Sequence, residues 1–179
     1  MSKTHVPMES TITEPGGRAG NRPFQFHDRP MCQMDGKRLV DFQLNDVDGH
    51  PFSFASVNSK LVLIDFWTTY CSPCLRAMPN LAKLQKRYGP QGLQIVGIAC
   101  EQGDLADRRA HVAKIRNQLQ IPYPLLIDEG GDNLLVRDNF RVISYPTLVL
   151  LDKSGKVLWR SETAEPADLV RLENLLKSQ

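Results

Sequence analysis

The sequence predicts an α/β fold in which helices flank a central mixed β-sheet. Two segments, Leu61–Trp67 and Leu93–Ala99, are almost continuous apolar runs, which are typical of strands covered on both faces. Residues 72–88 between them carry apolar side chains at helical spacing, and a strand, a helix and a strand in this order favour a right-handed parallel crossover. Two later apolar runs flank a Lys-Ser-Gly turn at 153–155, which predicts an antiparallel hairpin and makes the sheet mixed.

The N-terminal region divides into a tail and a hairpin. Residues 1–36 are polar and are interrupted by prolines and glycines, so we expect a flexible tail ahead of one domain over 37–179. The domain begins with a predicted hairpin whose strands are Leu39–Leu44 and Pro51–Phe54, with a turn at Asp48-Gly49.

An additional helix and strand are expected after the second central strand. The long helix over 72–88 ends at Gly89-Pro90, and the second central strand follows. A surface helix is then expected over Asp104–Leu119, a short strand over Tyr123–Ile127 and a weak helix over Asn133–Asn139.

The C-terminal region is expected to be a hairpin followed by a helix. The hairpin strands are Thr147–Leu151 and Lys156–Arg160. The final helix covers Glu165–Lys177, takes Thr163 as its N-cap and places its leucines on one face.

Composition restricts the classes of function. The 179 residues, 41% of them hydrophobic, are enough for one globular core. Positive and negative residues alternate along the chain and leave a net charge of +2, so no surface for nucleic acid or anionic lipid is predicted. A protein or a small molecule is the expected partner, and the protein is expected to be a monomer. No segment approaches the roughly 18 apolar residues of a membrane helix, and residues 1–30 lack the apolar stretch of a secretion signal.

Cys71 and Cys74 stand where the first central strand passes into the long helix. Backbone N–H groups at a helix start have no partner inside the helix and favour a thiolate, the reactive form, whose pKa falls from about 8.5 to roughly 3.5–7.5 in such settings. Cys71 is therefore the candidate nucleophile, and Cys74, one helical turn deeper, is the candidate resolving thiol. Pro73 fits the first turn, where a proline loses no hydrogen bond.

Two other interpretations of this cysteine pair stay open. Half of a zinc site would need about four ligands, and the sequence has neither a second Cys-x-x-Cys nor clustered histidines. A purely structural bridge would close too small a loop to constrain much of the unfolded chain. We assign no catalytic role to Cys32 or Cys100, and a bond between these two is left open because sequence does not give connectivity.

Asp65 interrupts the apolar run of the first central strand, six residues before Cys71. Burial without a charge partner raises the pKa of a carboxyl, so Asp65 is a predicted proton acceptor for Cys74 near neutral pH. The alternative is a carboxylate at a wet strand end.

Pro146 directly precedes a predicted buried strand, so it must stand where no ladder hydrogen bond is needed. A cis bond here would leave the backbone of Tyr145 available to an extended substrate peptide beside the thiol. An ordinary trans proline in a loop is the alternative.

Together these motifs resemble the thioredoxin superfamily, because Asp65-Phe66-Trp67, Cys71-x-Pro73-Cys74, Pro79 and Tyr145-Pro146-Thr147 occur in the family's order. The N-terminal hairpin and the additional helix and strand are similar to the TlpA/ResA branch, and the likeness covers about 39–177. The resemblance implies a thioredoxin fold, attack by Cys71, resolution by Cys74 and a helix kink at Pro79. It also implies a cis Pro146 facing the disulfide, and substrate contacts from Trp67, Ser72, Pro73, Tyr145 and Pro146.

The sequence departs from this family pattern at two places. The TlpA/ResA branch usually has a Glu where this chain has Ala77, and often an Asn where this chain has Asp65, so we hypothesise that the proton-accepting role has moved to Asp65. Ser144-Tyr145 replaces the Gly and aliphatic residue of thioredoxin, and this bulkier pair is expected to narrow the substrate groove.

The sequence therefore predicts a thiol-disulfide oxidoreductase without a cofactor, acting on protein dithiols or disulfides and on a redox partner protein. Reduction is favoured over oxidation by analogy, and the resemblance favours an extracytoplasmic location, with the cytoplasm as the alternative. One rival is a thiol peroxidase, suggested by Thr68 but lacking that family's proline, since Ile64 stands in its place. The other rival is a Cu(I) carrier that uses both thiolates.

Overall fold

The computed structural model describes residues 42–129 and 135–178. The tail predicted over 1–36 and the start of the predicted hairpin lie outside the described residues. The elements in chain order are β1 (Gln43–Asp46), β2 (Pro51–Ser53), the 3₁₀ turn η1 (Phe54–Ser56), β3 (Leu61–Trp67), α1 (Ser72–Tyr88), the 3₁₀ turn η2 (Gly89–Gln91), β4 (Leu93–Ala99), α2 (Leu105–Leu119), β5 (Leu125–Ile127), α3 (Leu135–Asn139), β6 (Thr147–Asp152), β7 (Val157–Ser161) and α4 (Pro166–Lys177).

The described strands form one sheet in the order β2-β1-β5-β4-β3-β6-β7. The three central strands β3, β4 and β5 are parallel to one another. The hairpins at either side, β1-β2 and β6-β7, pair antiparallel within themselves and with the central strands. The mixed sheet, the N-terminal hairpin and the additional helix and strand are therefore confirmed.

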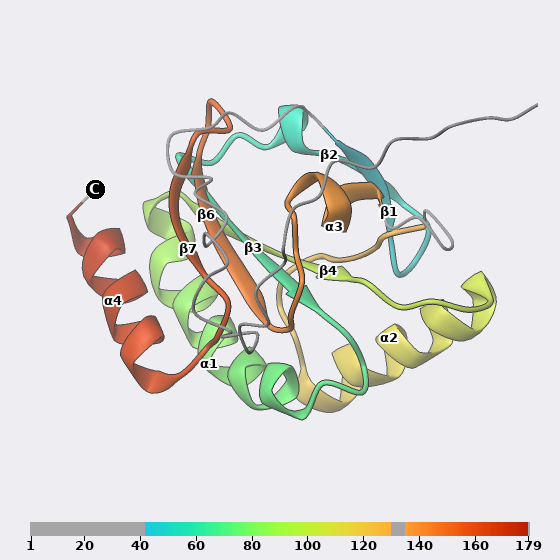
Figure 1. The fold of residues 1–179 in the computed structure, drawn as a ribbon. Helices are drawn as coiled ribbons and strands as arrows, with labels where there is room; N and C mark the ends of the chain where they lie inside the picture. The colour runs from blue at the N-terminus through green and yellow to red at the C-terminus, as the bar shows by residue number, and fades with distance from the viewer. Residues whose placement is uncertain (1–41, 130–134, 179) are drawn as a thin grey trace, which may run out of the picture. The chain divides into compact units, whose positions relative to one another are not determined.

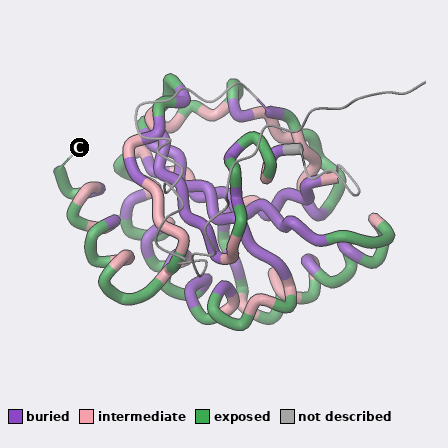
Figure 2. The backbone as a smooth tube through the Cα atoms, in the orientation of Figure 1, coloured by how far each residue is buried: buried purple, intermediate pink, exposed green. Residues whose placement is uncertain are grey.

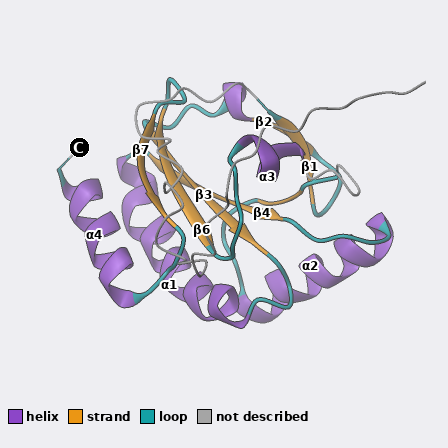
Figure 3. Cartoon of the chain, in the orientation of Figure 1, coloured by secondary structure: helices purple, strands orange, loops and turns teal. Residues whose placement is uncertain are grey.

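Helices cover both faces of this sheet. Helices α1, α2 and α4 lie on one face and the short α3 lies on the other (Figure 1; Figure 3). The strands between them are mostly buried (Figure 2). On the α3 side the core is aromatic, with the rings of Phe66 and Phe140 centred 5.0 Å apart.

The strand β3 fixes the geometry of the site because all seven of its residues are buried. Alternation along a strand directs Leu63, Asp65 and Trp67 to the face that packs on α1, and Ile64 and Phe66 to the face that packs on α3. The carboxyl of Asp65 thus enters the same core layer as the first turn of α1.

Several predicted boundaries are wrong by one or two residues at element ends, including those of β2, β6 and β7. The N-cap of α4 is Glu165 instead of Thr163, because Pro166 begins the helix and Asp168 accepts a hydrogen bond from the Glu165 N–H at 3.2 Å. The strand β5 begins at Leu125, so Tyr123 precedes it. The strand β1 runs on to Asp46, two residues beyond its predicted end.

Candidate active site

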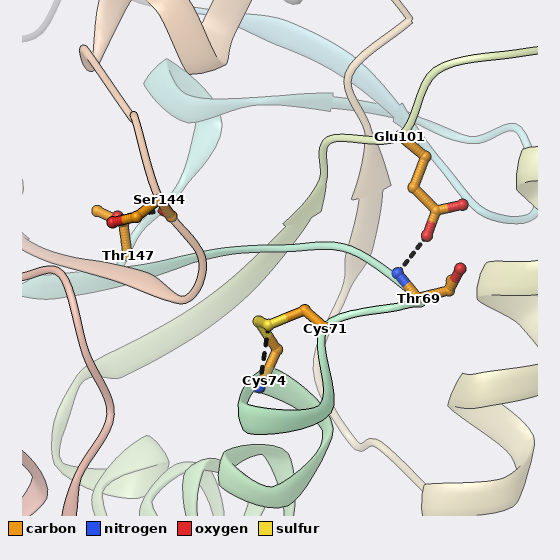
Figure 4. The surroundings of a disulfide bond; sticks show 6 residues. All are labelled: Thr69, Cys71, Cys74, Glu101, Ser144 and Thr147. Carbon is orange, nitrogen blue, oxygen red and sulfur yellow. Dashed lines mark hydrogen bonds between the residues drawn. A yellow bond between two sulfur atoms is a disulfide. The ribbon is translucent and has the colours of Figure 1, made fainter.

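The two sulfurs that define the site sit at the start of α1. Cys71 is the N-cap, Cys74 lies in the first turn, and their Cα atoms are 5.3 Å apart with a disulfide between the sulfurs (Figure 4). Cys71 is partly exposed, whereas Cys74 is completely buried. One sulfur therefore faces solvent and the other faces the core.

The helix start directs a donor at the exposed sulfur. The backbone N–H of Cys74 donates to the Cys71 Sγ at 3.2 Å. Ser72 and Pro73, both exposed, form the turn between the two cysteines. An unpartnered amide at a helix N-terminus stabilises negative charge, so this geometry favours a thiolate on Cys71 once the disulfide is reduced.

Asp65 is buried, with 1% of its surface exposed, and neither of its carboxyl oxygens hydrogen-bonds to another described residue. Burial raises the pKa of this carboxyl to about 7, because the charged form loses its hydration. The alternative of a wet strand end is therefore wrong. A carboxyl with this pKa accepts and releases a proton near neutral pH.

The loop before β6 supplies the second side of the site. The Tyr145-Pro146 peptide bond is cis, and the Thr147 hydroxyl donates to the Ser144 carbonyl at 2.8 Å (Figure 4). Pro146 is buried, while Tyr145 is half-buried. The Tyr145 hydroxyl is turned toward Arg137 and Cys100, and burial raises its pKa.

A groove of about 730 Å³ runs between α1 and α4 and reaches the active-site loop. Pro73 and Pro146 lie at its active-site end, and Arg87 and Glu173 form an ion pair of 2.6 Å on its walls. Ala77 also lines this groove. The groove therefore begins beside the turn between the two cysteines and follows α1.

Comparison with known proteins assigns the family. Residues 36–160 match the AhpC/TSA family. The thiol-disulfide oxidoreductase ResA of Halalkalibacterium halodurans is 30% identical over 133 residues, which are 74% of this chain and 70% of that protein. The chain is a ResA-like member of the AhpC/TSA family. The thioredoxin-like protein YneN of Bacillus subtilis is 32% identical over 124 residues, 69% of each chain.

A solved structure bears out the thioredoxin fold of this ResA-like chain. The thioredoxin domain of a thiol-disulfide oxidoreductase from Bacteroides vulgatus superimposes with a TM-score of 0.67 at 21% identity, covering 79% of this chain and 97% of that one. With its family and its redox-active cysteine pair at Cys-x-x-Cys spacing, the ResA-like chain is an enzyme of the thiol-disulfide oxidoreductase class.

Asp65 differs in its surroundings from the other buried acids of the described chain. Glu101 accepts a hydrogen bond from the Thr69 N–H, and Asp128 accepts one from the Arg137 N–H at 2.9 Å. Asp65 has no such donor. Burial alone therefore raises the pKa of Asp65.

The prediction that Trp67 contacts substrate disagrees with its position. Its side chain is completely buried in the core layer of α1, and its indole N–H has no hydrogen-bond partner among the described residues. Trp67 lies at the end of β3, where alternation turns it inward.

Sequence reasoning missed Glu101, which fastens the loop ahead of Cys71. The Glu101 carboxylate accepts from the Thr69 N–H (Figure 4), and the Arg108 guanidinium donates to the Glu101 carbonyl at 3.0 Å. An acidic residue two positions after a buried strand was the available signal, but it does not identify the amide that it meets.

Two exposed apolar side chains, one next to Cys71 and one close to the cis proline in sequence, were also missed. Tyr70, directly before Cys71, is 76% exposed, and Ile143, two residues before Tyr145, is 68% exposed. Large apolar side chains that stay exposed often mark a contact surface. Their exposure depends on tertiary structure and has no signature in the sequence.

Cys100 is a buried free thiol at the end of β4. It donates to the Ile98 carbonyl at 3.5 Å, and burial raises its pKa above the usual value for a thiol. Cys100 therefore forms no disulfide in this structure, Cys32 lies outside the described residues, and a buried thiol with a raised pKa is a poor nucleophile.

One group of side chains in the described chain has metal-ligand spacing, Asp46, Asp48 and His50 in the β1-β2 hairpin. Asp48 is already paired with Arg116. Within the described segments, no helix has the length and apolar character needed to cross a membrane.

Proposed function

We propose that this enzyme reduces disulfide bonds in polypeptides through a mixed disulfide on Cys71. The Cys71 thiolate attacks one substrate sulfur, an S–S bond forms between them, and the other substrate sulfur leaves as a thiolate that takes up a proton. The observation that carries this assignment is the partly exposed Cys71 sulfur at the α1 N-terminus, bonded to a buried Cys74.

Asp65 is proposed to assist the second step. Cys74 must lose its proton before its sulfur can displace the substrate from Cys71, and the raised pKa of Asp65 suits a proton acceptor at neutral pH. Asp65 takes that proton, the Cys71–Cys74 disulfide forms, and the second substrate thiol is released. Two electrons have then passed from enzyme to substrate, and a dithiol redox partner protein returns them.

The substrate is proposed to be an extended polypeptide segment lying across the cis-proline loop. The backbone beside Pro146 supports main-chain hydrogen bonds to such a segment. Ser72, Pro73 and Tyr145 would flank the reacting sulfur, and Tyr70 and Ile143 would contact apolar substrate side chains. We also propose that the protein is a monomer and, from its ResA-like family, that it acts outside the cytoplasm.

A trapping experiment tests the mechanism. Cys74→Ser should accumulate a mixed disulfide with a model substrate such as insulin, because attack proceeds but resolution cannot. Cys71→Ser should form no adduct and should reduce no insulin. Cys100→Ser is the matched control and should behave as wild type, because Cys100 is buried away from solvent. Wild-type activity in Cys71→Ser would refute the mechanism.

The thiol peroxidase rival is separated by peroxide consumption. Thr68, the residue that suggested it, is completely buried and its hydroxyl has no hydrogen-bond partner among the described residues, so it does not assist Cys71 at the surface. Peroxide turnover that persists in Cys74→Ser would favour the peroxidase. Stoichiometric copper in the reduced protein, lost in both cysteine variants, would favour the Cu(I) carrier.

A further inference from the structure

Three buried polar groups on the α1 face of the sheet have no hydrogen-bond partner among the described residues. They are the carboxyl of Asp65, the indole N–H of Trp67 and the hydroxyl of Tyr123. All three side chains are at most 3% exposed. A buried polar group without a partner costs about 1–3 kcal/mol, so three in one core layer require a reason.

Strand register brings these groups together over Gly97. In the sheet Asp65 lies beside Gly97, and Gly97 lies beside Leu125. A Cβ at Gly97 would lie 3.2 Å from the Trp67 Nε1 and 2.6 Å from the Leu125 Cδ2. The Trp67 indole N–H therefore lies over the residue adjacent to Asp65.

Tyr123 enters the same layer from the segment that precedes β5. It belongs to the core cluster that contains Trp67 and Cys74. Burial and, to a smaller extent, the negative charge of Asp65 raise the pKa of Tyr123. The thiol of Cys74, once reduced, belongs to the same core layer from α1, whereas the Cys100 thiol at the end of β4 lies in the core cluster on the α3 side.

The chemistry of the three groups is complementary. An ionised carboxylate only accepts hydrogen bonds, an indole N–H only donates, and a tyrosine hydroxyl does both. A buried carboxyl without hydrogen-bond donors resists ionisation. A carboxyl that is to accept a proton at this place must first be ionised, so it needs donors that stabilise its charged form. Tyr123 and Trp67 carry the unpartnered donors of the same core layer.

We propose that Tyr123 is a positioning residue for Asp65, and that its hydroxyl and the Trp67 indole N–H reach the Asp65 carboxylate through one buried water, to which they donate and which donates to the carboxylate. This inference rests on the proposed role of Asp65 in the resolving step. Tyr123 stabilises the ionised carboxylate before it takes the proton of Cys74, which keeps Asp65 usable as a base. It also gives the buried Trp67 a role without substrate contact.

The variant Tyr123→Phe removes one donor and keeps the ring. The rate of the resolving step is measured as the single-turnover decay of the mixed disulfide at a series of pH values. We expect the midpoint on the acid side of this pH profile to rise by about one pH unit. Tyr88→Phe is the matched control, because its hydroxyl bonds Glu173 at 2.9 Å, and its profile should overlay wild type. In an Asp65→Asn background, Tyr123→Phe should add no further shift.

Infrared titration of the protonated carboxyl band in the oxidised protein gives a second readout that needs no turnover. The midpoint of the Asp65 titration should rise in Tyr123→Phe. If Tyr123→Phe fails to fold, Trp67→Phe takes its place, and the midpoint should rise in that variant too. Unchanged midpoints and rate profiles, in a protein whose Asp65→Asn variant does change the rate profile, would overturn this inference alone. An Asp65→Asn rate profile equal to wild type would instead overturn the role of Asp65 itself.

Discussion

A single carboxyl group controls the chemistry at the residue scale. Asp65 is the one charged member of β3, and its pKa of about 7 has burial as its cause. The interruption of an apolar run was enough to predict this from sequence. The sequence could not indicate Tyr123 as its neighbour, because the two residues meet only through the register of β3, β4 and β5.

The cost of burying Asp65 predicts an unusual dependence of stability on pH. The folded carboxyl holds its proton up to about pH 7, whereas the unfolded one releases it near its ordinary value of 3.8. The free energy of unfolding should therefore fall as pH rises between these values. Asp65→Asn removes this loss, so urea unfolding of the oxidised protein should show the variant gaining up to about 4 kcal/mol on wild type between pH 4 and pH 8.

Asp48, whose pKa is shifted in the opposite direction, provides the control for that measurement. The Arg116 guanidinium lowers the pKa of Asp48, so the ionised form of Asp48 stabilises the fold. Asp48→Asn should therefore lower the free energy of unfolding at pH 8. Parallel pH curves for wild type and Asp65→Asn would contradict the burial of an unpartnered carboxyl.

At the scale of elements, continuous apolar runs were the strongest guide. The bounds of β3, α1 and β4 agree with the sequence prediction to the residue, because buried strands and a helix with an N-terminal proline have sharp ends. The starts of β5 and α4 were missed, since the first depends on pairing with another strand and the second on which of several nearby polar residues forms the cap. Long-range contacts such as that between Glu101 and Thr69 could not be predicted either, because they depend on how distant segments of the chain meet.

Close packing of β4 against β5 makes a second test available. In Gly97→Ala the new Cβ would lie 2.6 Å from the Leu125 Cδ2, so the layer around Asp65 must shift. We expect a loss of about 1–3 kcal/mol in the free energy of unfolding. A free energy of unfolding within about 0.5 kcal/mol of wild type would show that Gly97 is not tightly packed.

At the scale of the whole molecule, the sheet brings together three distant segments. The helix start at Cys71, the loop at Pro146 and the acid at Glu101 meet because β3 pairs with both β4 and β6. The first two carry family motifs and were predicted from sequence. Glu101, Tyr70 and Ile143 carry none, and only the fold indicates their place at the site.

Alkylation of the reduced protein by iodoacetamide across pH 4 to 9, followed residue by residue by mass spectrometry, tests the central claim most directly. We predict that Cys71 is modified with an apparent pKa below about 7.5 while Cys74 stays protected, because amides at the α1 start stabilise one exposed sulfur. Equal and slow modification of both thiols, with a pKa near the usual value of about 8.5, would contradict this account of the enzyme.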